Sequence, residues 1–501
     1  MQVQSVPKTS TGITGLDYIL DGGFPEGQFI LAQGAPGTGK TTLGLQFLIE
    51  GARKGERTLY ISFLHAKRDI QRIAGSHGLS LEGVETAELS SVGGTECEQT
   101  IFHTDEVELG ETINSIRDIV ERVSPQRLVF DSISELQLLS GSSYRCRQNV
   151  ASLKRLLAAR NCTSLIMVGE SDGNERETEH ISDGIILLQQ SSPDFGVVRR
   201  YLEIIKMRGM PYITGRHDYR IKTGGLEIYP RLQALSSRVS STGIEDIQKE
   251  ARLITTDVKE LDAMLGGGME EGSATLLLGA AGTGKSTITS AYAHSAAKEG
   301  TKSLILLFDE SVRAYCQRAK NLGLDLYPSI SSGVVSIRRI SVGEISPGEF
   351  SQIVRLAIEE DGVRLLIIDT LTGYLVNTLE ERSLLTQLHE LLAYTGDRDV
   401  LTIMTVTEHG LIGVNKAEPQ SVSLLADTVI LIRYFEAYGN IKRAITVFKK
   451  RYGEHETAIR EFMITSGGIN VGKSLEHFSG ILTGEPVFSG KKGELLEQET
   501  D

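Results

Sequence analysis

Short apolar runs alternate along this chain with longer stretches in which apolar residues recur every three or four positions. In the first half, the short runs that predict buried strands span 28–33, 58–63, 128–130, 164–168 and 184–188. Residues 42–54 place Leu43, Phe47 and Leu48 at helical spacing and predict a helix close behind the first run. Strands that alternate with helices are typical of a mostly parallel sheet with helices on both faces, so we predict the α/β class.

The same pattern occurs twice. The segment GAPGTGKT contains Lys40, and the segment GAAGTGKS contains Lys285, which lies 245 positions later. The runs RLVFD and RLLIID end at Asp131 and Asp369, which are 238 positions apart. A nearly constant offset over several motifs indicates two copies of one structural unit with small insertions.

The repeat fixes the expected domain organisation. A length of 501 residues allows two to four domains, and the duplication favours two. We predict an N-terminal domain over 1–235, a Ser-rich linker over 236–252, a C-terminal domain over 253–472 and an appended tail over 473–501.

Composition narrows the class of protein. The chain has 52 Lys and Arg against 65 Asp and Glu, a formal charge of −13, which disfavours sequence-independent DNA coating. Its four cysteines form no CxxC pair, so we expect no disulfide framework and no zinc site. No apolar run approaches the roughly 20 residues that span a bilayer, and the first residues lack a signal-peptide pattern. We therefore expect a cytoplasmic protein without a membrane segment.

Both Gly-rich segments fit GxxxxGK[ST] between a predicted strand and a predicted helix, the context of a phosphate-binding loop. Lys40 and Lys285 are expected to reach the β- and γ-phosphates of ATP, while Thr41 and Ser286 hold Mg²⁺. An ordinary Gly-rich turn is the alternative, but it does not explain two copies in matching context. The loop residues expected to bind ATP are Gly37, Thr38, Gly39, Lys40, Thr41, Thr42, Gly282, Thr283, Gly284, Lys285, Ser286 and Thr287.

A carboxylate at the end of a strand beside a phosphate loop is the usual partner of the metal. Asp131 and Asp369 fit this position, and a turn or helix-capping aspartate is the alternative. The residues expected around Mg²⁺ are Thr41, Asp131, Ser286, Asp309 and Asp369.

The two copies differ where hydrolysis needs a base. In the second copy the next predicted strand ends in Asp309 and Glu310, whereas Leu64 and His65 stand at the same offset in the first. A positioned general base supplies about 10²–10⁴-fold in rate. We therefore expect turnover in the second copy, and slow hydrolysis in the first unless His65 substitutes; His65 as a mere phosphate contact is the alternative.

With both loops and both strand-end aspartates, the chain resembles the tandem RecA-like ATPases of the KaiC family. The resemblance covers nearly the whole chain and is most specific over 426–464. It implies two RecA-like domains per subunit, an ATP-assembled homo-hexamer in the form of a double ring, and nucleotides at subunit interfaces.

The resemblance also implies trans-acting cations, which reach the nucleotide of a neighbouring subunit. Lys449 and Arg451 would act on the γ-phosphate, and together with Asp309, Glu310 and Lys285 they form the expected catalytic set of the second domain. Basic runs on an ordinary surface are the alternative reading. The further residues expected near nucleotide are Arg443, Lys450 and His455 in the second copy, and Lys206 and Arg208 in the first.

Circadian members of this family autophosphorylate on adjacent Ser and Thr, and Ser423 falls at the serine position. Leu424 stands at the threonine position and cannot accept phosphate, which opposes an ordered two-site cycle. A structural serine near a strand start is the alternative for Ser423. The chain looks more like the KaiC-like ATPases of bacteria and archaea outside the clock system.

Three functions remain open at this stage. The leading one is an ATP-hydrolysing hexameric switch in signalling, with Ser423 as candidate phospho-acceptor of a serine/threonine autokinase and a protein partner on the ring face or the tail 473–501. The second is a RecA/RadA-like DNA-dependent ATPase, which the basic loop expected at Arg216–Lys222 keeps open against the acidic charge. The third is a non-enzymatic scaffold that needs ATP only to assemble.

Overall fold

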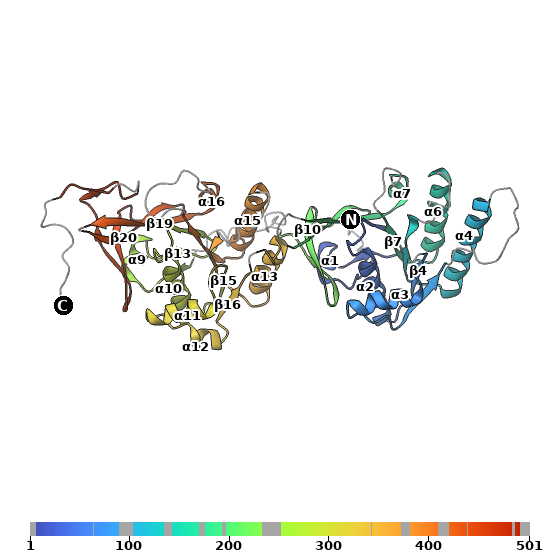
Figure 1. Cartoon of the computed structure of the whole chain (residues 1–501), viewed down its shortest axis with the longest axis horizontal. Coiled ribbons are helices and arrows are strands. Elements are labelled where there is room, and N and C mark those ends of the chain that lie inside the picture. Colours follow the sequence, from blue (N-terminus) through green and yellow to red (C-terminus); the bar gives the residue numbers. More distant parts are fainter. Residues whose placement is uncertain are drawn as a thin grey trace, which may run out of the picture. The chain divides into compact units, whose positions relative to one another are not determined.

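The computed structural model describes residues 7–63, 65–89, 104–134, 143–169, 176–192, 197–232, 252–341, 343–371, 381–408, 420–437, 439–482 and 486–490. It contains two compact units, one formed by 1–231 with 346–352 and the other by 232–345 with 353–501. Each unit contains a nine-stranded, mostly parallel sheet flanked by helices (Figure 1). The predicted fold class, two tandem RecA-like α/β domains, is confirmed.

The strands of the first unit are β1 (Lys8–Thr9), β2 (Phe24–Pro25), β3 (Phe29–Gly34), β4 (Thr58–Ser62), β5 (Val84–Glu88), β6 (Arg127–Asp131), β7 (Thr163–Val168), β8 (Gly184–Ser191), β9 (Arg199–Met207), β10 (Arg216–Lys222) and β11 (Gly225–Tyr229). Its helices are α1 (Thr14–Ile19), α2 (Lys40–Arg53), α3 (Lys67–Ser76), α4 (Thr104–Val123), α6 (Ser143–Ala158) and α7 (Arg176–Ile181).

The strands of the second unit are β12 (Leu253–Ile254), β13 (Met269–Glu270), β14 (Ala274–Gly279), β15 (Ser303–Leu307), β16 (Val335–Arg339), β17 (Leu365–Asp369), β18 (Leu401–Thr407), β19 (Thr428–Ala437), β20 (Asn440–Lys450), β21 (Arg460–Thr465), β22 (Gly468–Ser474), β23 (Phe478–Ser479) and β24 (Val487–Phe488). Its helices are α9 (Lys259–Met264), α10 (Lys285–Lys298), α11 (Val312–Asn321), α12 (Tyr327–Ser331), α13 (Pro347–Glu359), α15 (Glu381–Gly396) and α16 (Gln420–Leu425).

The two large sheets share one topology. The first runs β11-β10-β9-β8-β3-β7-β6-β4-β5, and the second runs β22-β21-β20-β19-β14-β18-β17-β15-β16. In each sheet six strands are parallel, and the last three form an antiparallel extension beside β8 or β19. We call the side where the parallel strands begin the amino edge and the side where they end the carboxyl edge. The phosphate loops follow β3 and β14 and therefore lie on the carboxyl edge.

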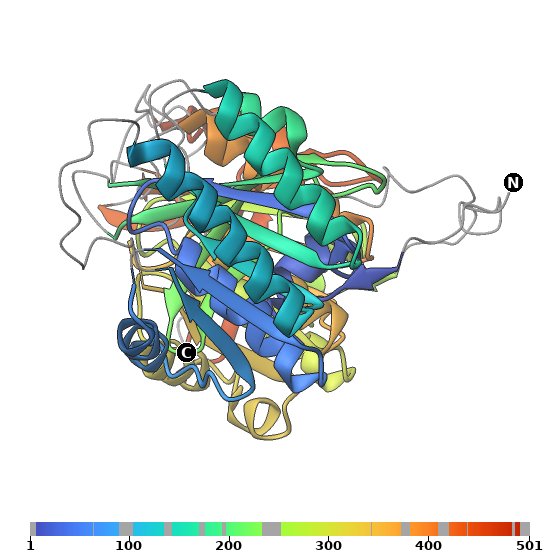
Figure 2. The ribbon, with the colours of Figure 1, turned by 90° about the vertical axis from the view of Figure 1, so that its right-hand side faces the viewer.

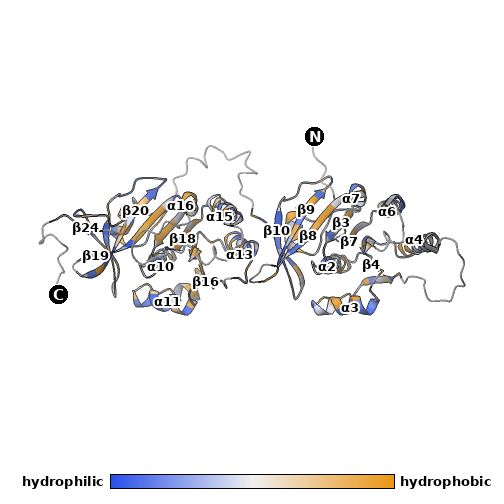
Figure 3. Cartoon of the chain, turned by 45° about the horizontal axis from the view of Figure 1, so that its top comes forward, coloured by the Kyte–Doolittle hydropathy of each residue, from blue (hydrophilic) through white to orange (hydrophobic). Residues whose placement is uncertain are grey.

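Side chains of the central strands alternate between two apolar layers. In β3, Ile30 and Ala32 are buried against α1, α2 and α3, while Phe29 and Leu31 are buried against α4 and α6. Figure 2 shows α4 and α6 side by side over one face of the first sheet. Figure 3 shows apolar colouring on central strands such as β8 and β18. Burial on both faces explains why these strands appear in the sequence as continuous apolar runs.

The expectation of a basic loop at Arg216–Lys222 is wrong, because this segment is strand β10, paired with β9 on one side and β11 on the other. His217 and Tyr219 alternate inward and are buried, which is the period-two pattern of a strand. The outward Lys222 forms an ion pair with Glu227 at 2.7 Å. The charged residues of this segment thus lie on a strand and do not form a DNA-binding loop.

His217 makes the stability of the first unit sensitive to acid. Its ring is fully buried, Nδ1 accepts the Arg231 backbone N–H at 3.0 Å, and Nε2–H donates to the Ile213 carbonyl at 3.0 Å. Burial lowers the pKa of His217 below its ordinary value of 6.5. The unfolded chain therefore binds this proton first, and stability is lost as the pH falls below that value.

We expect the unfolding free energy of the first unit to fall between about pH 7.5 and about pH 5.5, by at most about 1.4 kcal/mol per pH unit for this one proton. Hydrogen exchange of first-unit peptides, followed by mass spectrometry, measures this free energy separately from that of the second unit. His217→Gln should be less stable at the higher pH and should lack this part of the slope. Equal slopes for both proteins would show that His217 does not cause the effect.

Candidate functional site

Each phosphate loop turns through glycines with positive φ. Gly37 and Gly39 have φ of 83° and 92°, and Gly282 and Gly284 have φ of 78° and 108°, a region that L side chains rarely adopt. Gly39 and Gly284 immediately precede α2 and α10, so each loop ends at the N-terminus of a helix with 14 residues. Unpaired N–H groups of such a helix N-terminus bind anions.

Buried threonines close the loops internally. Thr38 and Thr283 are fully buried, and their Oγ1 atoms donate to the carbonyls of Ala35 at 2.8 Å and Ala280 at 2.9 Å. These two residues were expected among the ATP-binding set. In the structure their side chains shape the loop, and their backbone N–H groups donate to the same two carbonyls at a longer distance of 3.4 Å.

The two loop lysines fold over their own loops. Lys285 Nζ donates to the carbonyls of Gly279 at 2.7 Å and Ala280 at 2.9 Å, and Lys40 Nζ donates to those of Gly34 and, at 3.1 Å, Ala35. Burial lowers the pKa of Lys285 to about 8. A phosphate bound in the loop would replace these carbonyls as the partner of the ammonium and would favour its charged form.

In the first copy three side chains converge where Mg²⁺ is expected. Thr41 Oγ1 donates to Asp131 Oδ2 at 3.0 Å, and the phenol of Tyr60 donates to the same oxygen at 2.5 Å. Burial, and then the charge of Asp131, raise the pKa of Tyr60 well above its usual value, so the phenol remains a donor. The hydroxyl and carboxylate oxygens match the ligand chemistry of Mg²⁺.

In the second copy Asp369 is 4% exposed, and its Oδ1 accepts a hydrogen bond from Thr405 Oγ1 at 2.6 Å. No hydrogen-bond donor within the described ranges reaches the buried Oδ2. Ser286 is the second residue of α10, which packs against the strand that Asp369 ends. A buried carboxylate oxygen without a partner is costly, and a cation with its water shell would supply one, so these residues fit Mg²⁺.

Asp309 and Glu310 lie just beyond β15 on the carboxyl edge of the second sheet, separated from the strand by Phe308. Asp309 Oδ2 accepts a hydrogen bond from Thr370 Oγ1 at 2.6 Å. Both carboxylate oxygens of Glu310 accept hydrogen bonds from the guanidinium of Arg318, at 2.7 and 2.8 Å. These contacts orient both acids on the carboxyl edge, the same edge on which the loop that contains Lys285 lies.

The corresponding part of the first copy has neither acid. Leu64 lies outside the described residues, and the backbone N–H of His65 donates to Ser62 Oγ at 2.9 Å. Ile73, half-buried on α3, stands at the position of Arg318. The loss of the carboxylates is therefore accompanied by the loss of the arginine that orients one of them.

The basic residues at the end of β20 lie on the opposite edge of the sheet from the phosphate loop of their own chain. Lys449 pairs with Val429 near the start of β19, whereas the loop follows Gly279, which pairs with Ile432. Lys449 Nζ donates to the Ala426 carbonyl at 2.7 Å. Strand β14 has six residues and separates the two edges by about 20 Å, at about 3.3 Å per residue.

The first copy repeats this arrangement. Lys206 Nζ donates to the Ser182 carbonyl at 2.7 Å, and Arg208 lies 3.6 Å from Asp183. Arg451 correspondingly donates to Asp427 Oδ1 at 2.9 Å. Within one chain, the structure does not bring any of these cations to the phosphate loop that precedes them.

The three remaining residues expected near the nucleotide of the second domain, Lys450, Arg443 and His455, lie in different places. Lys450 has a side chain that is 3% exposed and donates to the Leu265 carbonyl at 2.7 Å, so its ammonium is bound within its own domain. Arg443 lies over the ring of Tyr434, 5.6 Å from its centre, on the carboxyl edge. The Tyr434 hydroxyl donates to the Ala281 carbonyl of the phosphate loop at 3.4 Å. His455 is half-buried, four positions beyond Arg451.

Several site residues are missing from the sequence prediction. Tyr60 and Thr405 are 71 and 36 positions from the aspartates that they contact. Arg318 is eight positions from Glu310. No motif marks any of the three. Glu408 is the first residue after β18, much as Asp369 is the last residue of β17, and an acid at the end of an apolar strand is a usable signal. The side chain of Glu408 is 6% exposed. It forms an ion pair with Arg433 at 3.0 Å, and its backbone N–H donates to Gly279 of the loop strand at 3.2 Å.

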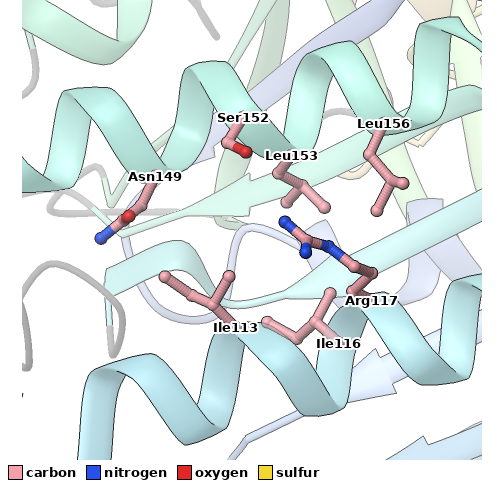
Figure 4. A pocket seen from close by; sticks show the side chains of 7 residues that line it. All are labelled: Ile113, Ile116, Arg117, Asn149, Ser152, Leu153 and Leu156. Atoms are coloured by element: carbon pink, nitrogen blue, oxygen red, sulfur yellow. The ribbon is translucent and has the colours of Figure 1, made fainter. Parts of the chain in front are cut away.

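A small pocket lies between α4 and α6 (Figure 4). Its volume of about 30 Å³ suits water and not a nucleotide. The residues that line it are Ile113, Ile116, Arg117, Asn149, Ser152, Leu153 and Leu156.

In the part of the chain that the structure describes, no helix is long and apolar enough to cross a membrane. No three His, Cys, Asp or Glu side chains in these ranges are grouped as ligands of one metal ion. A Mg²⁺ ion held by one hydroxyl, water and nucleotide phosphates does not need such a group.

A phosphate loop after a central strand, a strand-end aspartate beside it and a parallel sheet define a P-loop ATPase domain, here present twice. A family model described as the KaiC ATPase matches residues 9–233 and 254–476. The chain belongs to the KaiC ATPase family.

Known relatives match nearly the whole chain at low identity. The "Circadian clock oscillator protein KaiC" of Parathermosynechococcus lividus is 25% identical in an alignment of 495 positions that covers 97% of this chain and 89% of the relative. The "Circadian clock protein KaiC3" of Synechocystis sp. is 26% identical, over 98% of this chain and 96% of the relative. The "Circadian clock oscillator protein KaiC" of Prochlorococcus marinus subsp. pastoris is 27% identical, over 97% of this chain and 94% of the relative.

Proposed function

We propose that this protein is a nucleotide-dependent switch that hydrolyses ATP in its second domain and retains ATP in its first. The observation that carries the proposal is the chemical difference between the two carboxyl edges. The second has Asp309 and Glu310, oriented by Thr370 and Arg318, whereas the first has no carboxylate at Leu64 or His65. Glu310 is the general base for the attacking water.

Mg²⁺ bound with the nucleotide would neutralise charge on the phosphate oxygens. Ser286 would hold it in the second domain, with Asp369 oriented toward it, and Thr41 with Asp131 would do so in the first. Lys285 would bind the phosphates, and Asp309, whose carboxylate accepts a hydrogen bond from the hydroxyl of Thr370, would lie beside the metal. The side chains of these residues supply only oxygen and ammonium groups, which suits charge stabilisation and positioning.

The active form is a homo-oligomer, and the family resemblance favours a double-ring hexamer. Lys449 and Arg451 lie on the amino edge, about 20 Å from the phosphate loop of their own domain, so they need the nucleotide of another domain, which we place in a second subunit. Placed there, they would stabilise charge that develops on the γ-phosphate. Loss of that phosphate on hydrolysis would remove a bridge between subunits, which provides the switch.

A serine autokinase activity at Ser423 is the second candidate. Ser423 lies in α16 and its carbonyl accepts a hydrogen bond from Lys449 at 3.4 Å, so the residue and this cation lie together on the amino edge. A subunit that presents Lys449 to a neighbouring nucleotide would therefore present Ser423 to it as well. Leu424, 73% exposed, offers no acceptor, which opposes the ordered two-site cycle of a clock.

The output of the switch would be read by a protein partner, on the ring face or on the tail 473–501. Two alternatives compete with this function. The DNA-dependent ATPase was favoured by a basic loop expected at Arg216–Lys222, but this segment is a strand paired on both sides. An ATP-assembled scaffold without turnover is opposed by the oriented acids Asp309 and Glu310.

The deciding experiment follows label and assembly in one sample. The protein is incubated with γ-labelled ATP and Mg²⁺, and free phosphate, protein-bound label and particle size are then measured. Free phosphate indicates an ATPase, and label that disappears in Ser423→Ala indicates the autokinase. Release of phosphate only with single-stranded DNA would favour the DNA-dependent ATPase. Assembly with ATP but without any phosphate release would favour the non-enzymatic scaffold.

Lys40→Ala should mainly weaken assembly, because the first domain would lose the nucleotide that its neighbour contacts. Turnover per assembled particle should remain, since the second domain keeps its acids. Lys285→Ala is the matched variant at the same loop position, and it should abolish turnover. If Lys40→Ala removed turnover with the assembly intact, the proposed division of labour would be wrong.

A further inference from the structure

The two strand-end aspartates are held by hydroxyl groups that come from opposite neighbouring strands. Asp131 accepts from Tyr60, which lies on β4, whereas Asp369 accepts from Thr405, which lies on β18. The repeat register places Ile305 where the first copy has Tyr60, and Met167 where the second has Thr405. All four side chains are fully buried. The exchange is reciprocal, because each copy has one hydroxyl and one apolar side chain at these two positions.

The exchange changes which carboxylate oxygen remains for a metal. In the first copy Asp131 Oδ2 accepts two hydrogen bonds, from Tyr60 at 2.5 Å and Thr41 at 3.0 Å. In the second, Thr405 occupies Oδ1 of Asp369, and Oδ2 is buried without a donor among the residues described. Asp131 Oδ2 thus has two donors before any ligand binds, whereas the buried Asp369 Oδ2 has none among the described residues.

This difference has a direct consequence for Mg²⁺. A carboxylate oxygen with two donors has its negative charge partly neutralised and attracts a cation and its water shell less strongly. A buried carboxylate oxygen without a donor carries a desolvation cost that the hydrated cation removes on binding. Nucleotide binding should therefore gain less from Mg²⁺ in the first domain than in the second.

We propose that Tyr60 reduces the Mg²⁺ dependence of nucleotide binding in the first domain, so that this site retains ATP at Mg²⁺ concentrations at which the second domain releases it. The inference rests on the proposed function in one respect, that both phosphate loops bind ATP. Tyr60 is a positioning residue in this account, because it acts on the metal through Asp131. It would separate a permanent nucleotide site from an exchanging one within one chain.

The measurement is the ratio of the ATP dissociation constants without and with Mg²⁺, determined at each site of the full chain. Lys285→Ala leaves the first site to be measured with labelled ATP, and Lys40→Ala leaves the second. We expect a smaller ratio at the first site. Adding Tyr60→Phe to the Lys285→Ala chain should raise the first-site ratio by about threefold to tenfold, the loss expected for one buried hydrogen bond.

Tyr219→Phe is the matched control. The Tyr219 hydroxyl donates to the Thr38 carbonyl of the same phosphate loop at 2.6 Å and does not touch Asp131. Its removal should change ATP affinity equally with and without Mg²⁺, so the ratio should stay constant. Tyr60→Phe with Met167→Thr should give a raised ratio, because it reproduces the hydroxyl arrangement of the second copy.

The opposite substitutions in the second domain test the inference independently of whether the first-domain variants fold correctly. Ile305→Tyr with Thr405→Met in the Lys40→Ala chain should lower the ratio at the second site. An unchanged or lower first-site ratio in Tyr60→Phe would overturn the inference while leaving the proposed function intact. Absence of ATP binding by the Lys285→Ala chain, with normal hydrogen exchange in its first unit, would instead refute the first-domain nucleotide site and the inference with it.

Discussion

Glu310→Gln is expected to lower steady-state ATP hydrolysis by the full chain by about 10²-fold or more, because an amide cannot take a proton from the attacking water. The substitution preserves size and keeps one oxygen to accept a hydrogen bond from Arg318, so the fold of the carboxyl edge should survive. Phosphate release is measured at saturating ATP, and labelled ATP binding in the same preparation confirms that the second site is filled.

His65→Gln is the control, because His65 occupies the position of Glu310 in the first copy. It should leave phosphate release nearly unchanged. A large loss in His65→Gln together with little effect of Glu310→Gln would assign turnover to the first domain. That result would mean that the imidazole serves as base, the alternative that the sequence leaves open.

Lys449→Ala should lower hydrolysis by about 10³-fold or more if its ammonium acts on the nucleotide of a neighbouring subunit. The stronger test is complementation between two inactive proteins. A chain with Lys449→Ala keeps Glu310, and a chain with Glu310→Gln keeps Lys449. In a mixed assembly, about a quarter of the interfaces would combine both intact groups, so activity should reappear on mixing.

The control for complementation is a chain that carries both substitutions. Mixed with Lys449→Ala, it supplies no intact Lys449, and no activity should return. Lys449→Ala alone should bind ATP normally at its own site, because Lys449 lies on the opposite edge from that site. Full activity of the Lys449→Ala protein, or failure of mixing to restore any, would exclude action in trans.

Much of the fold follows from local sequence. The apolar run 28–33 corresponds to β3 at Phe29–Gly34, and the helix expected over 42–54 is α2 at Lys40–Arg53. The helix begins earlier than expected because Gly39, with φ of 92°, ends the loop immediately before Lys40. Periodicity predicts the elements and the Gly-rich motif predicts the loop, since both are encoded within a few residues.

Other parts of the site depend on contacts that are remote in sequence. Tyr60, which donates a hydrogen bond to Asp131, is 71 positions away from it. The distance of Lys449 from the phosphate loop of its own domain results from the antiparallel pairing of β20 with β19. Single-chain patterns do not encode such pairings. Arg216–Lys222 was wrongly expected to be a loop because its charges outnumber its apolar residues, although His217 and Tyr219 point inward at strand spacing. The roles assigned to the individual site residues remain predictions.

The placement of complementary groups on opposite edges of one sheet has a geometric consequence for assembly. A contact in which the amino edge of one subunit meets the carboxyl edge of the next is heterologous, and it either closes into a ring or continues as a filament. In an open row, the subunit at one end always has a nucleotide that no neighbour contacts, while the subunit at the other end presents unused cations. Only closure makes every site equivalent. The ring would thus be the smallest form of this protein in which no subunit is left incomplete.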